Sequence, residues 1–191
     1  VIGLLMGNML RYVENVERAD VAVKICRIDV NSAARNIREM ALNSDTSTYD
    51  SYQQQVETQL AEVDSELKAD IVLADVPCSG YGVIGKKPEI KYRVTPQKQE
   101  EIVILQRTIL DCAAEYVKPG GVLVFSTCTI AKEENEENML WFMNNHPFKL
   151  ESIDPYLPEE LHSETTALGY LQLLPGVHKT DGFFIAKFRR K

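Results

Sequence analysis

The chain has 191 residues, of which 45% are hydrophobic and 26% are charged, and its formal net charge is −7. This composition is typical of a globular protein, and the length favours one domain over residues 1–191. We find no apolar stretch long enough to cross a membrane and no signal-like amino terminus, so we expect a cytoplasmic protein with no membrane partner. The net negative charge argues against a nucleic-acid-binding protein that is basic over its whole surface, although a local basic patch can still bind nucleic acid.

The four cysteines are far apart in the chain, at Cys26, Cys78, Cys112 and Cys128. No C-x-x-C pair is present, which argues against a zinc ribbon or a thioredoxin-like site, and we expect no metal. Without secretory signals, the thiols are expected to be reduced. Cys26 falls within a predicted strand and Cys112 within a predicted helix, so we expect both to be core residues.

The first third of the chain is predicted to alternate between strand and helix. Residues 20–29 are rich in β-branched side chains and predict a strand. Residues 32–43 carry apolar side chains at helical spacing. Residues 51–67 are compatible with a strand or a helix, and we favour a helix over their second half.

The central part predicts two more strands separated by a helix. The apolar run at 70–75 has no helical stripe and predicts a strand buried on both faces. A glycine-rich loop at 79–85 and a basic segment with prolines follow it. Thr95 is predicted to cap an amphipathic helix over about 96–117, and a Lys-Pro-Gly-Gly turn then leads into a strand at 121–126.

The last part predicts a helix over 131–145, a loop framed by prolines, and two strands. The strands cover 169–174 and 182–189, and their length and turn residues predict an antiparallel pair. Strand–helix alternation followed by a hairpin predicts an α/β fold. Its doubly wound sheet would be mostly parallel, with an antiparallel carboxyl-terminal hairpin.

Two of the cysteines stand where predicted strands end. Asp75, Pro77 and Cys78 come at the end of the first apolar run, and Cys128 comes at the end of the second. Because parallel strands of an α/β sheet present their carboxyl ends at one edge, where ligands bind, we expect both thiols at that edge. A structural role is the alternative for each cysteine, but the glycines after Cys78 weaken it because they let a ligand approach closely.

Three motifs carry a resemblance to a known family. They are DVPCSGYGVIGKKPEIKYR from residue 75, KPGGVLVFSTCTIAKEENE from residue 118 and HKTDGFFIAKFRR from residue 178. Together they resemble the Sun-type RNA cytosine-5 methyltransferases over residues 69–191, in the order in which the family has them. The resemblance implies a Rossmann-like, S-adenosylmethionine-dependent methyltransferase fold and an activity on small-subunit (16S) ribosomal RNA.

The same resemblance implies a task for each residue at the strand ends. Carbon 5 of cytosine is a poor nucleophile, so a thiolate must first add to carbon 6. The family pattern makes Cys128 the attacking thiol, Cys78 the residue of the release step, and Asp75 the contact to the N3/N4 edge of the base. Two cysteines with two tasks argue against a DNA cytosine methyltransferase, which would use the Pro-Cys cysteine alone.

Cofactor contacts are implied at Asp29, Asp75 and Pro77. Asp29 ends a predicted strand, where an acid can accept hydrogen bonds from ribose hydroxyls, and Glu17 is a competing candidate. The family's cofactor loop, D-x-x-A-x-P-G-G-K, has no counterpart before residue 69, so we expect that the chain begins just after this loop or has diverged there. The acid beside the adenine stays open among Glu57, Glu62 and Asp64.

RNA contacts are implied by the basic segment after the glycine-rich loop. Its basic residues are Lys86, Lys87, Lys91 and Arg93, and Tyr92 stands among them. Positive charge beside an aromatic ring suits phosphates and unstacked bases, although an ordinary solvated loop would look similar. For the chain as a whole, the second hypothesis is a non-catalytic RNA-contacting fragment that has lost the cofactor loop.

Overall fold

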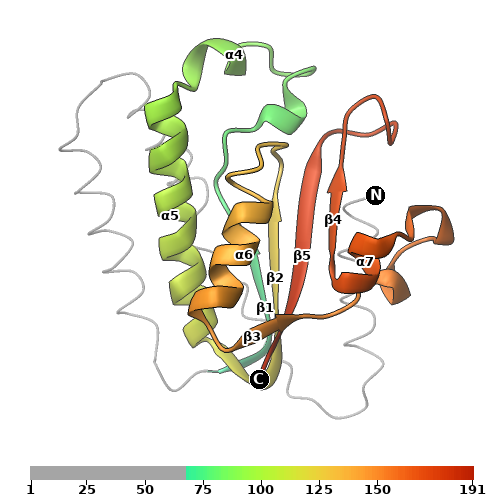
Figure 1. Ribbon diagram of the computed structural model, residues 1–191. Helices are drawn as coiled ribbons and strands as arrows, with labels where there is room; N and C mark the ends of the chain where they lie inside the picture. The colour runs from blue at the N-terminus through green and yellow to red at the C-terminus, as the bar shows by residue number, and fades with distance from the viewer. Residues whose placement is uncertain (1–67) are drawn as a thin grey trace.

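The computed structural model describes residues 68–191, which are coloured in Figure 1. The predicted strand at 20–29, the predicted helix at 32–43 and the segment 51–67 lie outside the described residues. The same holds for Cys26 and for the candidate cofactor residues Glu17, Asp29, Glu57, Glu62 and Asp64.

The described elements alternate between strands and helices, with short 3-10 helices marked η. In chain order they are β1 (Ala69–Asp75), η1 (Tyr81–Val83), α4 (Ile90–Arg93), α5 (Pro96–Glu115), β2 (Val117–Thr127), α6 (Glu136–Asn145), β3 (Phe148–Leu150), η2 (Asp154–Tyr156), η3 (Glu159–Leu161), α7 (Glu164–Leu168), β4 (Tyr170–Leu173) and β5 (Phe183–Arg190). The strands predicted in this part of the chain are present as β1, β2, β4 and β5. The predicted cap of α5 is also confirmed, because the Thr95 hydroxyl accepts a hydrogen bond from the Lys98 N–H.

The sheet that these strands form is mixed. β1 and β2 pair in parallel, with Asp75 opposite Ser126 at their carboxyl ends. β5 pairs antiparallel with β2 along one edge and with both β3 and β4 along the other. The predicted carboxyl-terminal hairpin is confirmed as β4 and β5. Within residues 68–191, however, antiparallel pairs outnumber the parallel pair, because β3 and β4 share one edge of β5 and add no parallel strand.

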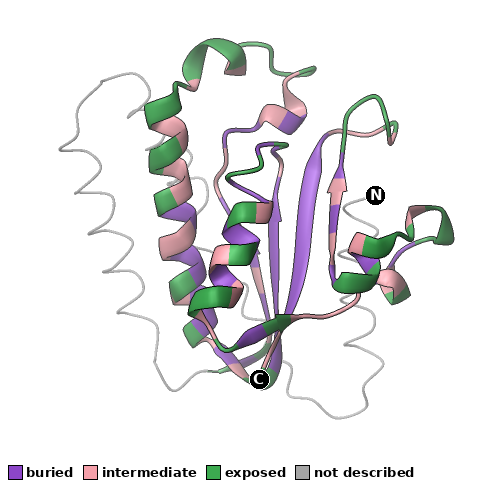
Figure 2. Cartoon of the chain, in the orientation of Figure 1, coloured by how far each residue is buried: buried purple, intermediate pink, exposed green. Residues whose placement is uncertain are grey.

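Both faces of β2 are buried. On one face the sheet packs against α5 and α6, whose core side chains include Leu110 and Phe142. On the other face, Val122 and Val124 pack with Ile153 from the segment after β3. Figure 2 shows β2 and β5 buried along most of their length. Coverage on both faces explains why these strands read as continuous apolar runs.

The helix predicted over 131–145 is confirmed as α6, but it begins at Glu136, so its predicted start at residue 131 was wrong. Glu134 and Asn135, just before α6, are buried in a turn. Asn135 has φ −110° and ψ −92°, values outside the helical range, and its side chain bonds to Thr127 and to the Thr129 carbonyl. The acidic run resembles the first turns of a helix, but part of it points into the protein.

The segment predicted as a loop framed by Pro147, Pro155 and Pro158 contains the short strand β3, and the helix α7 follows it. α7 is short and begins with a capping box, in which the Ser163 hydroxyl accepts from the Thr166 N–H and the Thr166 hydroxyl accepts from the Ser163 N–H. Capping of this kind stabilises a helix whose length alone would not.

β3 and β4 lie end to end along β5 and meet beside Lys187. The Lys187 N–H donates to the Gly169 carbonyl, and the Lys187 carbonyl accepts from the Glu151 N–H. Gly169 has φ +127°, and a Cβ atom there would lie 2.7 Å from the Glu151 carbonyl oxygen. Glycine is therefore required at this junction.

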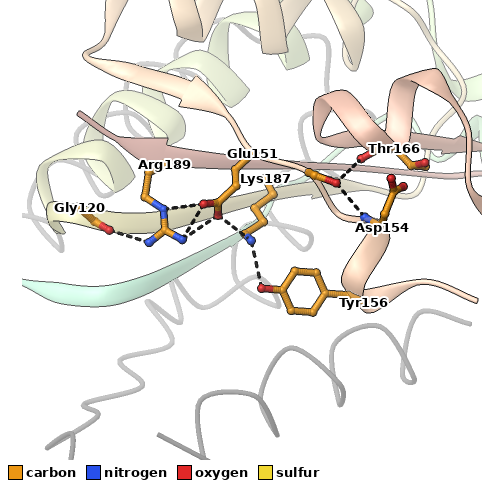
Figure 3. A network of polar contacts seen from close by, with 8 residues as sticks. Gly120, Glu151, Asp154, Tyr156, Thr166, Lys187 and Arg189 are labelled. Atoms are coloured by element: carbon orange, nitrogen blue, oxygen red, sulfur yellow. Dashed lines mark hydrogen bonds and ion pairs between the residues drawn. The ribbon is translucent and has the colours of Figure 1, made fainter.

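A polar network holds the same junction, as Figure 3 shows. The Glu151 carboxylate lies 2.7 Å from both Lys187 Nζ and Arg189 Nη2, and Lys187 Nζ donates to the Tyr156 hydroxyl at 3.1 Å. Burial raises the pKa of Glu151, but hydrogen bonds from Arg189 and Lys187 outweigh it and leave the pKa lowered. Lys187 pairs with Val124, well before the carboxyl end of β2, so the network stabilises the fold away from Cys128.

Candidate functional site

The carboxyl ends of β1 and β2 bring two thiols together. Because the strands run in parallel, with Asp75 opposite Ser126, the turns that follow them leave the sheet side by side. Cys78 Sγ lies 3.2 Å from Cys128 Sγ, within hydrogen-bond range for sulfur, and either thiol can be the donor. The expectation that these cysteines meet at one sheet edge is confirmed.

The two thiols differ in acidity because they share a hydrogen bond. The contact with Cys128, together with burial, raises the pKa of Cys78. The same hydrogen bond lowers the pKa of Cys128, although burial acts in the opposite direction. The pair therefore favours a thiolate on Cys128 that accepts a hydrogen bond from the Cys78 thiol.

Asp75 stands next to the thiols at the last position of β1. It is exposed, whereas its neighbours Ala74 and Val76 are buried. The Ser126 hydroxyl donates to Asp75 Oδ1 at 2.9 Å. Loss of hydration near the sheet edge raises the pKa of the Asp75 carboxyl, and the hydrogen bond from Ser126 only partly offsets this. Asp75 thus keeps its proton to a higher pH than an ordinary aspartic acid, so more of it is in the protonated form that can donate.

Side chains from α5 and from the turn before α6 hold the turn that carries Cys78. The Ser79 N–H donates to Glu134 Oε2 at 2.8 Å, and the Pro77 carbonyl accepts from Gln106 Nε2 at 2.8 Å. We did not predict a role for Gln106 or Glu134. The sequence does contain an indication for Gln106, which is a polar residue on the buried side of an amphipathic helix. It contains none for Glu134, which stands among other acidic residues.

The Cys128 turn is held by a second set of contacts. Asn135 Nδ2 donates to the Thr129 carbonyl at 3.1 Å and to Gln172 Oε1 at 2.7 Å. The Ser79 hydroxyl lies 2.7 Å from the Thr129 hydroxyl, which ties this turn to the Cys78 turn.

All three motifs that carry the family resemblance meet at Gly82. The Gly82 N–H donates to the Cys128 carbonyl at 3.1 Å, and the Gly82 carbonyl accepts from the Gly182 N–H at 2.8 Å. A Cβ atom on Gly82 would lie 2.7 Å from the Cys128 carbonyl oxygen and would overlap the Gly182 carbonyl. In the third motif, His178 Nδ1 accepts a hydrogen bond from the Leu174 N–H at 3.0 Å, which is a structural contact.

The predicted RNA contacts lie on the surface beyond the Cys78 turn. Lys86, Lys87, Lys91 and Arg93 are all exposed. The exposed Tyr92 lies between the last two of them, on α4, which Figure 1 places beyond the carboxyl ends of β1 and β2. Lys86 Nζ lies 2.6 Å from Asp181 Oδ2, so part of its charge is already neutralised.

Two further properties concern the part of the chain that the structure describes. No helix in residues 68–191 has the length and apolar character needed to cross a bilayer. Among the same residues, no three His, Cys, Asp or Glu side chains cluster as metal ligands would.

Known proteins share both the sequence and the fold. Residues 9–189 match the family described as "16S rRNA methyltransferase RsmB/F". The chain is 43% identical over 124 residues to the probable ribosomal RNA small subunit methyltransferase B of Bacillus subtilis. The aligned region covers 64% of this chain and 28% of that protein. The chain is also 37% identical over 123 residues to ribosomal RNA small subunit methyltransferase F of Cronobacter sakazakii, covering 63% and 25%.

A solved structure extends the likeness to three dimensions. It is the crystal structure of NSun6 from Pyrococcus horikoshii with SFG, at 32% identity and a TM-score of 0.57, covering 69% of this chain and 32% of that one. The described strands and helices are thus part of a Rossmann-like methyltransferase fold. This chain spans about a quarter of the length of the two curated relatives. Because the family match covers nearly all of the chain, the chain belongs to the RsmB/F family of 16S rRNA methyltransferases.

Proposed function

We propose that this chain forms the cytosine-activating part of an RNA cytosine-5 methyltransferase that acts on small-subunit (16S) ribosomal RNA. The observation that carries the proposal is the pair of thiols, Cys78 and Cys128, held 3.2 Å apart at the ends of adjacent parallel strands. The names of the relatives support the substrate class, since both are small-subunit ribosomal RNA methyltransferases.

The cofactor in this proposal is S-adenosylmethionine, which supplies an electrophilic methyl group when bound. Among the described residues, Asp75 and Pro77 would contact it at the end of β1. The exposed carboxyl of Asp75, flanked by buried neighbours, fits a ligand at the carboxyl edge of the sheet. Asp29 would bind the ribose hydroxyls, and it lies outside the described residues.

The first step is attack by Cys128. Its thiolate, stabilised by the Cys78 thiol, forms a bond from sulfur to carbon 6 of the target cytosine. The electrons of the 5,6 double bond move towards the ring nitrogen N3, where Asp75 donates a proton. Carbon 5, now nucleophilic, would take the methyl group that S-adenosylmethionine supplies, and S-adenosylhomocysteine would be the leaving group. The raised pKa of Asp75 supports its part as a proton donor.

The second step releases the product. Carbon 5 now carries both a methyl group and a proton, and Cys78, after giving its own proton to solvent, removes the carbon 5 proton. The electrons of that bond restore the 5,6 double bond, the sulfur–carbon 6 bond breaks, and Cys128 leaves as a thiolate. The N3 proton returns to Asp75, so one proton is released for each methyl group transferred.

The exposed basic residues after the Cys78 turn would bind RNA phosphates. Lys87, Lys91 and Arg93 are exposed, and the last two lie on α4, beyond the carboxyl ends of β1 and β2. Lys86 contributes less because Asp181 pairs with it. The target base would leave its stack to reach the two cysteines.

Nucleoside analysis tests the proposal directly. The protein is incubated with S-adenosylmethionine and a 16S ribosomal RNA transcript, and the RNA is digested and analysed by mass spectrometry. We expect 5-methylcytidine, and methylation of another atom would overturn the proposal. Absence of methylation together with absence of saturable S-adenosylmethionine binding, but with RNA binding retained, would favour the non-catalytic fragment instead.

A further inference from the structure

A buried polar cluster lies behind the turn that carries Cys78. Its members, Gln106, Glu134 and Asn138, are each 0% exposed, and the proposed reaction uses none of them. Buried polar side chains are costly unless they are hydrogen-bonded, so their partners indicate why they are there.

Two members of the cluster hold the peptide groups on either side of Cys78. Gln106 Nε2 donates to the Pro77 carbonyl at 2.8 Å, and Glu134 Oε2 accepts from the Ser79 N–H at 2.8 Å. Gln106 Nε2 also donates to Glu134 Oε2 at 3.1 Å, which joins the two contacts into one bridge. The backbone before and after the thiol is therefore fixed by the same pair of side chains.

The third member fixes the direction of the Gln106 amide. Asn138 Nδ2 donates to Gln106 Oε1 at 2.7 Å, which leaves Gln106 Nε2 facing the Cys78 turn. Arg107 Nε donates to Asn138 Oδ1 at 2.8 Å, and the Arg107 guanidinium lies 5.1 Å from the centre of the Trp141 ring. The bridge is thus anchored in both α5 and α6.

The carboxyl group of Glu134 is poorly satisfied apart from this bridge. In the described structure its Oε1 atom is buried without a hydrogen-bond partner. Burial raises the pKa of Glu134, and the hydrogen bonds from Ser79 and Gln106 offset this only in part. The neighbouring Glu133, by contrast, is exposed, and its Oε2 accepts a hydrogen bond from Gln99 Nε2. Burial of the Glu134 carboxyl group is costly, and the two hydrogen bonds that its Oε2 accepts explain why it is nevertheless buried.

We propose that Glu134 is a positioning residue. Together with Gln106, it orients the Cys78 thiol so that Cys78 can remove the carbon 5 proton. The inference rests on the function proposed above. Glu134 does not reach the substrate, and it acts by fixing the backbone from Pro77 to Ser79. The Cys78 thiol is then held beside Cys128, close to the position that carbon 5 of the Cys128 adduct would take.

The test separates release from attack. In Glu134→Ala the Cys128 adduct still forms, but the Cys78 thiol is no longer aligned. We expect kcat to fall by about tenfold or more with an unchanged KM for RNA, and a covalent protein–RNA complex to accumulate on a denaturing gel. Glu134→Gln keeps an oxygen that can accept from both Ser79 and Gln106, so it is expected to restore turnover.

Matched variants keep the outcome interpretable. Glu133→Ala removes the exposed neighbour and is expected to release product like the unmodified protein. Gln106→Leu removes the Pro77 contact from the opposite side of the bridge, so it is expected to accumulate adduct even if Glu134→Ala fails to fold. Release at the normal rate by folded Glu134→Ala or Gln106→Leu overturns the inference. An unmodified protein that forms neither adduct nor 5-methylcytidine contradicts the proposed function instead.

Discussion

Cys78 Sγ lies 3.2 Å from Cys128 Sγ, although the two residues are 50 positions apart in the chain. The contact results from the parallel register of β1 and β2, which places both turns at one edge of the sheet. At this distance the two thiols cannot both be ionised without strong repulsion, so the pair keeps at least one proton between the two sulfur atoms. In the function proposed above, this shared proton distinguishes the attacking thiol from the thiol of the release step.

Removing each thiol in turn is expected to give opposite results. Cys78→Ala leaves the nucleophile but removes the base of the release step, so turnover is expected to fall by about 10²–10⁴-fold while a covalent RNA adduct accumulates. Cys128→Ala removes the nucleophile and is expected to abolish the adduct. Denaturing gels with labelled RNA measure both. Cys112→Ala, on α5, is the control and should resemble the unmodified protein, and an adduct seen only with Cys128→Ala would reverse the two roles.

The shared proton also predicts how thiol reactivity depends on pH. Because the hydrogen bond from Cys78 lowers the pKa of Cys128, alkylation of Cys128 by iodoacetamide should reach half its maximum rate at a lower pH than alkylation of an ordinary cysteine thiol. Cys78→Ala removes the donor, so the midpoint is expected to move to higher pH. Peptide mass spectrometry at a series of pH values follows Cys128 alone.

A conservative variant provides the control for this shift. Cys78→Ser keeps a hydroxyl that can donate to the Cys128 thiolate, so its midpoint should stay closer to that of the unmodified protein. Equal midpoints in all three proteins would show that the contact does not control the acidity of Cys128.

The strands and the thiols could be predicted from the sequence because their signals are local. Apolar runs that end in a small polar cluster mark buried parallel strands, and the rule that strand ends meet at one edge then brings Cys78 and Cys128 together. The cap at Thr95 is local in the same way. These predictions required no knowledge of distant contacts.

The supporting residues could not be predicted, because their roles depend on contacts between distant segments. Glu134 bonds to Ser79, 55 positions away, and its acidic neighbours suggest a solvated helix start. The late start of α6 has the same cause, since the backbone before it turns to point Glu134 and Asn135 inward. Local patterns report which residues are apolar, but they do not report which polar residues are buried.

The meeting of three segments at Gly82 predicts strong intolerance to a side chain. Gly82→Ala would place Cβ 2.7 Å from the Cys128 carbonyl oxygen and against the Gly182 backbone, so these segments must separate. We expect a loss of about 1–3 kcal/mol in unfolding free energy, together with reduced activity because the Cys128 turn shifts. Urea unfolding measures the first effect. Gly85→Ala is the control, since a Cβ there meets nothing within 4 Å, and equal losses in both variants would contradict the close approach.

The network at the β3–β4 junction predicts a pH-dependent contribution to stability. Lys187, whose side chain is 5% exposed, depends on Glu151 for its opposite charge. Glu151→Ala is expected to lower the unfolding free energy by about 2–3 kcal/mol at pH 7, less than for a fully enclosed pair because Glu151 is partly exposed. Urea unfolding measures the loss, with Glu136→Ala as the control, because its pair with Lys132 is exposed and 3.8 Å long.

The sign of the pH dependence follows from the lowered pKa of Glu151. A carboxyl group with a lower pKa in the folded state binds fewer protons there than in the unfolded state, so its contribution is complete above its ordinary pKa and declines in acid. The difference between the unmodified protein and Glu151→Gln should therefore be constant near neutral pH and shrink as the pH falls below about 4.5. A difference that stays constant down to pH 3 would mean that Glu151 contributes through packing and not through its charge.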